Sequence, residues 1–136
     1  MSDPREGLER LRAAAADGSL AELCARHHVR VLTVFGSTIG DKPNPQDLDI
    51  AVGFEYDAAS DFLALMDDLM ALTGVDRVDL LDLDRAGPVA KEQGLTYGTP
   101  LFESEPGAYA VAEMAASGMR RDTAHLRRRM LELMAE

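Results

Sequence analysis

Apolar residues recur along the chain with two periods, and each change of period marks a boundary between predicted elements. Helical spacing at the start predicts two short helices, separated at Asp17-Gly18. The second helix opens with residues 19–22, Ser-Leu-Ala-Glu, which have the form of a capping box. A β-branched and apolar run over residues 29–35 then predicts a buried strand, which ends at Gly36.

Residues 47–54 alternate between apolar side chains and polar or small ones, the pattern of a strand with one buried face. The apolar side consists of Leu48, Ile50, Val52 and Phe54. Asp47 and Asp49 stand on the other side, so both carboxylates are expected on one face of the sheet, with Cα atoms roughly 7 Å apart. The segment between the two strands contains Pro43 and Pro45 and no periodicity, which predicts a loop.

The remaining elements alternate in type, which favours an α/β (α+β) fold with a small mixed sheet flanked by helices. They are a helix capped by Ser60 and ended by Gly74, a strand at about 77–83, a short helix from Gly87-Pro88 to Glu92 or Gln93, an extended segment from Leu95 to Phe102, and a helical C-terminus over about 106–136. With 136 residues, the chain is expected to form a single domain, residues 1–136.

Charge and cysteine content narrow the functional class. The formal net charge of −10 opposes sequence-independent binding to a phosphate backbone, so no direct nucleic-acid binding is expected. No apolar stretch approaches the ~20 residues that span a bilayer, and the first residues lack the features of a signal peptide. Cys24 is the single cysteine and has no internal disulfide partner. These features predict a cytoplasmic protein without a membrane anchor.

The segment from the first strand to the second holds the candidate chemistry. A strand that ends in Gly36-Ser37 can turn tightly and leave backbone N–H groups and a hydroxyl available to phosphate oxygens. The carboxylates of Asp47 and Asp49 repel each other, and a hard cation such as Mg²⁺ relieves that repulsion. The Gly36-Ser37 turn and the pair of aspartates together predict a site for Mg²⁺ and a nucleoside triphosphate.

The strand at about 77–83 supplies a third acidic residue. Asp79 and Asp82 have opposite parity, so only one of them can share a face with Asp49, and spacing alone leaves the choice open. If this strand lies beside the second one, a site of three carboxylates results, which is typical of metal-assisted nucleotidyl transfer. The competing interpretation is a solvated strand face in a chain with 24 acidic residues.

This combination of motifs resembles a known family. The motifs, in chain order, are Phe35-Gly36-Ser37, Asp47-x-Asp49, and a Val-Asp-Leu strand that contains Asp79. In this order they are similar to the minimal nucleotidyltransferases of the DNA polymerase β superfamily, over about residues 29–102. The segment from Glu103 into the last helices is similar to the C-terminal part of the MntA-type antitoxins, which belong to HEPN/MNT toxin–antitoxin modules.

The resemblance implies the nucleotidyltransferase fold and a role for each motif. Gly36 and Ser37 would hold the triphosphate of ATP. Asp47 and Asp49 would bind Mg²⁺, and Asp79 would complete the metal site and activate the attacking hydroxyl. The resemblance thereby favours Asp79 over Asp82. Two positions depart from the family pattern, since residues 38–40 lack the usual arginine and Gln46 replaces the usual serine.

The short chain leaves no room for a separate acceptor-binding domain, so the resemblance implies that the acceptor is another protein. The expected partner is a HEPN-domain toxin, and the expected reaction moves AMP from ATP to a toxin tyrosine, with this chain as the antitoxin. The alternative is a binding-only antitoxin with a vestigial nucleotide site, which neutralises its partner by contact. A third interpretation, an antibiotic-modifying transferase that works as a homodimer, needs an acceptor pocket for which the sequence gives no sign.

Overall fold

The computed structural model describes residues 3–36, 47–55 and 61–116. In chain order the elements are α1 (Pro4–Asp17), α2 (Ser19–Arg26), β1 (Val29–Phe35), β2 (Leu48–Phe54), α3 (Phe62–Thr73), β3 (Val78–Asp82), α4 (Pro88–Leu95) and β4 (Thr99–Glu103). Residues 108–116 form a further helix. The predicted helical residues beyond 116, and the predicted loop between β1 and β2, lie outside the described ranges.

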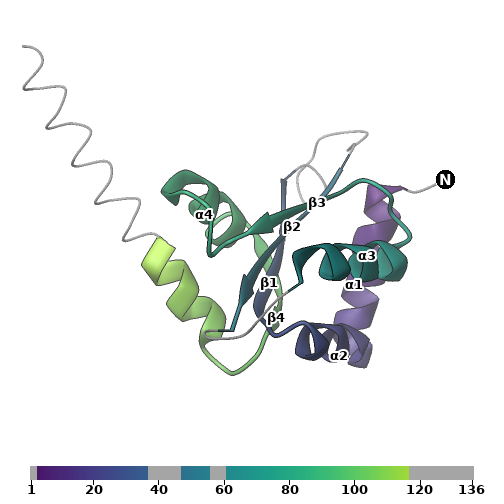
Figure 1. The fold of residues 1–136 in the computed structure, drawn as a ribbon, viewed down its shortest axis with the longest axis horizontal. Helices are drawn as coiled ribbons and strands as arrows, with labels where there is room; N and C mark the ends of the chain where they lie inside the picture. Colours follow the sequence, from purple (N-terminus) through teal and green to yellow (C-terminus); the bar gives the residue numbers. More distant parts are fainter. Residues whose placement is uncertain (1–2, 37–46, 56–60, 117–136) are drawn as a thin grey trace, which may run out of the picture.

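The four strands form one mixed sheet in the order β3-β2-β1-β4 (Figure 1). β1 runs antiparallel to both of its neighbours, β2 and β4. β2 and β3 are parallel and adjacent, and α3 makes the crossover between them. The predicted α/β class with a small mixed sheet is therefore confirmed.

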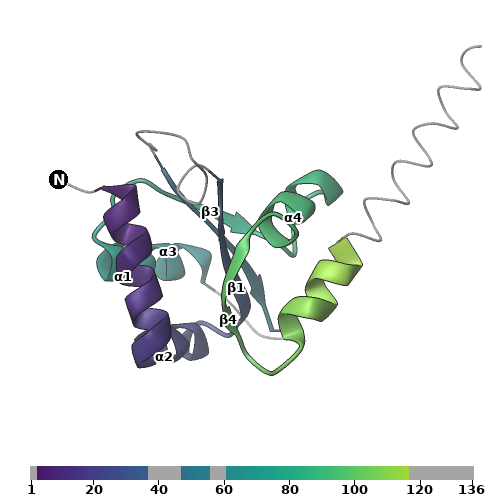
Figure 2. The ribbon, with the colours of Figure 1, turned by 180° about the vertical axis from the view of Figure 1, so that it is seen from behind.

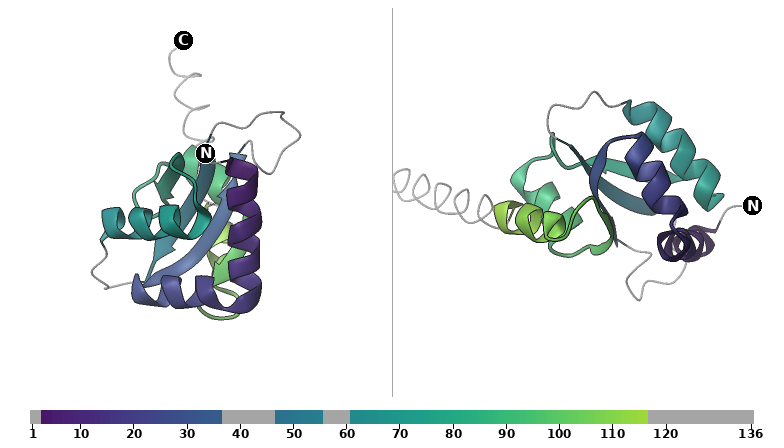
Figure 3. Two further views of the ribbon diagram at one scale, coloured as in Figure 1. Left: turned by 90° about the vertical axis from the view of Figure 1, so that its right-hand side faces the viewer. Right: turned by 90° about the horizontal axis from the view of Figure 1, so that it is seen from below.

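Helices cover both faces of this sheet (Figures 2 and 3). The larger buried cluster joins α1, α2 and α3 to the face of β2 that carries Leu48, Ile50, Val52 and Phe54. A smaller cluster joins α4 and helix 108–116 to the opposite face, through Ala51, Leu83 and Leu95. Because side chains alternate along a strand, Asp49 shares the face of Ala51. The predicted carboxylate face is thus the one on the α4 side.

Side-chain caps and glycines set the ends of the long helices. Asp3 caps α1 by accepting a hydrogen bond from the backbone N–H of Arg5 (3.0 Å), and Asp61 caps α3 in the same way from Ala64 (3.1 Å). Both helices end at a glycine in the left-handed region, Gly18 and Gly74, as their positions in the sequence predict. None of the described helices is long and apolar enough to cross a membrane.

Three local predictions were wrong. Ser19 does not form a capping box: Asp17 Oδ1 accepts hydrogen bonds from the hydroxyl and backbone N–H of Ser19, and these hold the pKa of Asp17 below its usual range. Asp61, rather than Ser60, is the N-cap of α3, because its carboxylate reaches a backbone donor three residues later. Leu95 ends α4 instead of starting an extended segment, and β4 begins only at Thr99.

The histidine at the end of α2 connects that helix to α3. His27 Nε2 lies 2.6 Å from Asp68 Oδ2, and the His27 side chain is largely buried. The hydrogen bond from His27 holds the pKa of Asp68 below its ordinary value of 3.8. A carboxyl group whose pKa is lower in the folded state stabilises the fold fully above its unfolded-state pKa, and this contribution is lost as pH falls through the folded-state pKa.

Asp68→Asn is therefore expected to lower the stability of the protein near neutral pH, and the difference from the parent is expected to shrink as pH falls below 3.8. Urea unfolding of both proteins across this range measures the effect. The exposed neighbour Asp67 provides a matched control, Asp67→Asn. A stability difference for Asp68→Asn that stayed constant across the range would contradict the assignment.

Candidate active site

Gly36 brings the end of β1 directly against Asp49. The backbone at Gly36 has φ +80°, which L side chains rarely adopt. A Cβ atom at this position would overlap Asp49 Oδ2 and lie 2.9 Å from Asp49 Cγ. The contact follows from the antiparallel register, which pairs Phe35 with Asp49. Glycine is therefore required here for two reasons, the backbone angle and the space that the Asp49 carboxylate fills.

The parallel register of β2 and β3 pairs Asp49 with Asp79. Paired residues on adjacent strands project from the same face, so both carboxylates belong to the α4 side of the sheet. Asp49 is partly buried and Asp79 is exposed. Two carboxylates on adjacent strands repel each other, and a cation that binds oxygen ligands relieves that repulsion.

Asp82 belongs to the opposite face. It pairs with Val52, whose side chain lies in the core under α1, α2 and α3. Asp82 accepts a hydrogen bond from the backbone N–H of Asp84 (2.9 Å) and forms an ion pair with Arg85 (3.8 Å). The register thus brings Asp79, and not Asp82, to Asp49.

The other predicted site residues are placed less fully. Asp47 lies immediately before β2 and is exposed. The next residue, Leu48, donates a backbone hydrogen bond to Arg77 O (2.9 Å). Ser37 lies outside the described ranges. Among residues 3–36, 47–55 and 61–116, no group of three or more His, Cys, Asp or Glu side chains is arranged to bind a metal ion. The donor chemistry does fit Mg²⁺, because all three predicted ligands are carboxylates and two of them are paired across the strands.

A buried threonine attaches α4 to the sheet beside this pair. The Thr33 side chain is fully buried, and its hydroxyl donates a hydrogen bond to the carbonyl oxygen of Gly94. A Cβ on Gly94 would lie 2.9 Å from the Cβ of Ala51, so α4 sits directly on β2 two residues beyond Asp49. No sequence motif points to Thr33 or Gly94, because the contact joins residues 61 positions apart.

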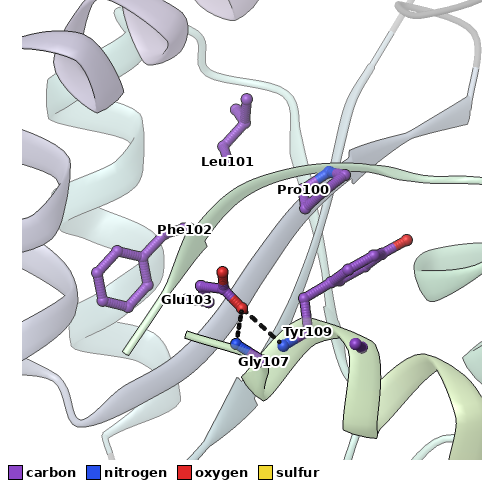
Figure 4. A pocket seen from close by; sticks show the side chains of 7 residues that line it. Pro100, Leu101, Phe102, Glu103, Gly107 and Tyr109 are labelled. Carbon is purple, nitrogen blue, oxygen red and sulfur yellow. Dashed lines mark hydrogen bonds between the residues drawn. The ribbon is translucent and has the colours of Figure 1, made fainter. Parts of the chain in front are cut away.

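A hollow beside β4 is a separate feature (Figure 4). It has a volume of about 430 Å³ and is lined by β4 and the start of helix 108–116, including Phe102, Glu103 and Tyr109. Glu103 Oε1 accepts hydrogen bonds from the backbone N–H groups of Gly107 (3.2 Å) and Tyr109 (3.1 Å), which caps that helix. The lining of this hollow does not include Gly36, Asp47, Asp49 or Asp79. The Glu103 carboxylate caps the helix and so has a structural role.

Solved structures show the same fold. A chain from a crystal structure of a toxin–antitoxin with AMP-PNP is 22% identical, with a TM-score of 0.66, and the match covers 88% of this chain and 98% of that one. A chain from the complex of a tri-AMPylated HEPN toxin of Shewanella oneidensis with its MNT antitoxin is 21% identical, with a TM-score of 0.63 and coverage of 92% and 99%. These likenesses confirm the nucleotidyltransferase fold.

A third structure is closer in sequence. A protein described as a candidate minimal nucleotidyltransferase is 35% identical, with a TM-score of 0.55, and the match covers 74% of this chain and 96% of that one. No curated protein gives a significant match. The family model for "Polymerase beta, Nucleotidyltransferase" matches residues 19–106, a segment that includes every residue of the candidate site. This chain therefore belongs to the polymerase beta nucleotidyltransferase family.

Proposed function

We propose that this protein transfers AMP from ATP to a hydroxyl group of a partner protein in the cytoplasm, and that the partner is a HEPN-domain toxin for which this chain is the antitoxin. The observation that carries the proposal is the pairing of Asp49 with Asp79, with Gly36 against the Asp49 carboxylate. Asp49 and its paired neighbour Asp79 thus lie near the end of β1 at Gly36. The same combination of a phosphate-binding turn and paired carboxylates suits nucleotidyl transfer.

In the proposed reaction the residues of the site bind the phosphates, hold the metal ion and accept a proton. Gly36 and Ser37 bind the β and γ phosphates through backbone N–H groups and the hydroxyl. Asp47, Asp49 and Asp79 would hold Mg²⁺, which when bound neutralises charge on the α-phosphate and on the leaving pyrophosphate. The Asp79 carboxylate accepts the proton of the attacking hydroxyl. A bond forms from the hydroxyl oxygen to the α-phosphorus, the bond from the α-phosphorus to the bridging oxygen breaks, and pyrophosphate leaves with the electron pair.

The choice of partner is supported by the proteins that share the fold. Several similar chains come from MntA–HepT toxin–antitoxin structures, and in one complex the HEPN toxin carries three AMP groups. These chains match this one over 96 to 99% of their own length.

The alternative is a binding-only antitoxin, and one feature favours it. Residues 38–40 lack the arginine that is common after the Gly-Ser motif, which removes one positive charge from the expected triphosphate site. Calorimetry with ATP and Mg²⁺ separates the two functions. A nucleotidyltransferase is expected to bind ATP only when Mg²⁺ is present, with binding lost in Asp49→Asn. A protein that forms a tight complex with its partner but does not bind ATP in either condition would be the binding-only antitoxin.

A further inference from the structure

The segment that joins α4 to β4 contacts β1 at Thr33, on the strand next to the one that carries Asp49. A Cβ on Gly98 would lie 3.0 Å from Thr33 Oγ1 and would overlap the carbonyl oxygen of Gly94. Thr33 lies on the same face as Asp49, one strand away and two residues along, which puts their Cα atoms about 8 Å apart. The chain at Gly98 therefore passes over the sheet at the edge of the proposed nucleotide site.

Tyr97, immediately before Gly98, presents an exposed aromatic ring from this segment. The residue is 61% exposed, although its backbone is fixed on both sides. Its N–H donates to Glu92 O (3.3 Å) at the end of α4, and two residues later Thr99 pairs with Val34 in the sheet. Helix 108–116 supports the same corner, because the hydroxyl of Tyr109 donates to Leu95 O.

When a ligand binds to an exposed tyrosine whose backbone is already fixed, only the side-chain torsion angles lose freedom. Tyrosine and tryptophan therefore give large contact areas at low conformational-entropy cost. A nucleobase is a planar partner for such a ring, and stacking works for every base because each one has a π-face. A nucleotide whose α-phosphate lies at Asp49 has its base at a distance from the carboxylates, and the segment that carries Tyr97 contacts Thr33, one strand away from Asp49.

We infer that Tyr97 stacks on the base of the bound nucleotide and so contributes to nucleotide affinity. This inference rests on the proposed function, because it takes the carboxylate pair as the site of the phosphates. The role differs from that of Gly36, Ser37 and the aspartates, since Tyr97 would contact the nucleoside and not the triphosphate. It follows that Tyr97 affects the binding of ATP but not the binding of inorganic tripolyphosphate.

Calorimetry on the full chain with Mg²⁺ tests this inference, with ATP and tripolyphosphate as separate ligands. Tyr97→Ala is expected to weaken ATP binding by about 5- to 100-fold and to leave tripolyphosphate binding unchanged. Tyr97→Phe keeps the ring and is expected to bind both ligands as the parent does. Val89→Ala, at the other end of α4 and 51% exposed, is the control for removal of an exposed apolar side chain.

Each other outcome overturns the inference in a recognisable way. If Tyr97→Ala binds ATP as tightly as the parent, Tyr97 does not contact the base, while the proposed function is still judged by Asp49→Asn. If ATP and tripolyphosphate weaken equally, the substitution acts on the site in general. If ATP binding is normal but the partner protein is no longer modified, Tyr97 belongs to a protein-docking surface. If the parent itself binds no ATP, both the inference and the proposed function fall.

Discussion

Asp49→Asn is expected to reduce AMP transfer by on the order of 10²- to 10³-fold or more, which is the cost of removing one group that stabilises charge in a transition state. Asparagine keeps the size of the side chain but loses the negative charge that binds Mg²⁺. Because the substitution also removes repulsion between positions 49 and 79, which are paired across β2 and β3, the fold is expected to survive it. Release of pyrophosphate from ATP in the presence of the partner measures the activity.

Asp82→Asn is the matched control for this experiment. Asp82 lies on β3, as Asp79 does, but pairs with Val52 and so belongs to the opposite face. Its substitution is expected to leave AMP transfer close to that of the parent. Circular dichroism and thermal unfolding of both variants check that the fold is intact. Equal activity in Asp49→Asn, Asp82→Asn and the parent would show that the pair of Asp49 and Asp79 has no part in AMP transfer.

Gly36→Ala is expected to weaken Mg²⁺-dependent ATP binding by about 10- to 100-fold, the cost typical of disturbing the residues that orient a metal ligand. The added methyl group would stand where Asp49 Oδ2 lies, so the carboxylate has to move. The substitution also places alanine at φ +80°, which L residues avoid. Calorimetry with ATP and Mg²⁺ gives the affinity, and urea unfolding gives the stability.

Gly107→Ala separates these two effects. Gly107 has φ +93° and no heavy atom within 4 Å of the position of an added Cβ, so its substitution tests the backbone angle alone. Both variants are expected to lose stability, but only Gly36→Ala is expected to lose ATP affinity. Equal ATP affinity in the two variants would show that the contact between Gly36 and Asp49 has no part in nucleotide binding.

The order and type of the elements could be predicted because they depend on local patterns. Alternation over residues 47–54 identified β2 and its two faces, and the breaks at Gly18 and Gly74 located helix ends that the structure reproduces. The α/β class followed from the alternation of strands and helices, and the mixed sheet agrees with the resemblance to the nucleotidyltransferase fold. Errors occurred where neighbouring polar residues competed for one role, as Asp61 did with Ser60.

The contacts that organise the candidate site depend on strand register, which the sequence does not encode locally. Parity excluded one of Asp79 and Asp82 but could not choose between them until β3 was paired with β2. The contact of Gly36 with Asp49 depends on the register of β1 and β2. The hydrogen bond from Thr33 to Gly94 joins segments that are distant in the sequence, and no local motif predicts it.

Intact mass spectrometry of the partner tests the central proposal most directly. The product of the adjacent gene would be co-expressed with the parent chain, and separately with Asp49→Asn and with Asp79→Asn. We expect the partner to gain the mass of one or more AMP groups with the parent chain and to remain unmodified with either variant. A partner that binds the parent chain tightly and keeps its unmodified mass would rule out AMP transfer and identify a binding-only antitoxin.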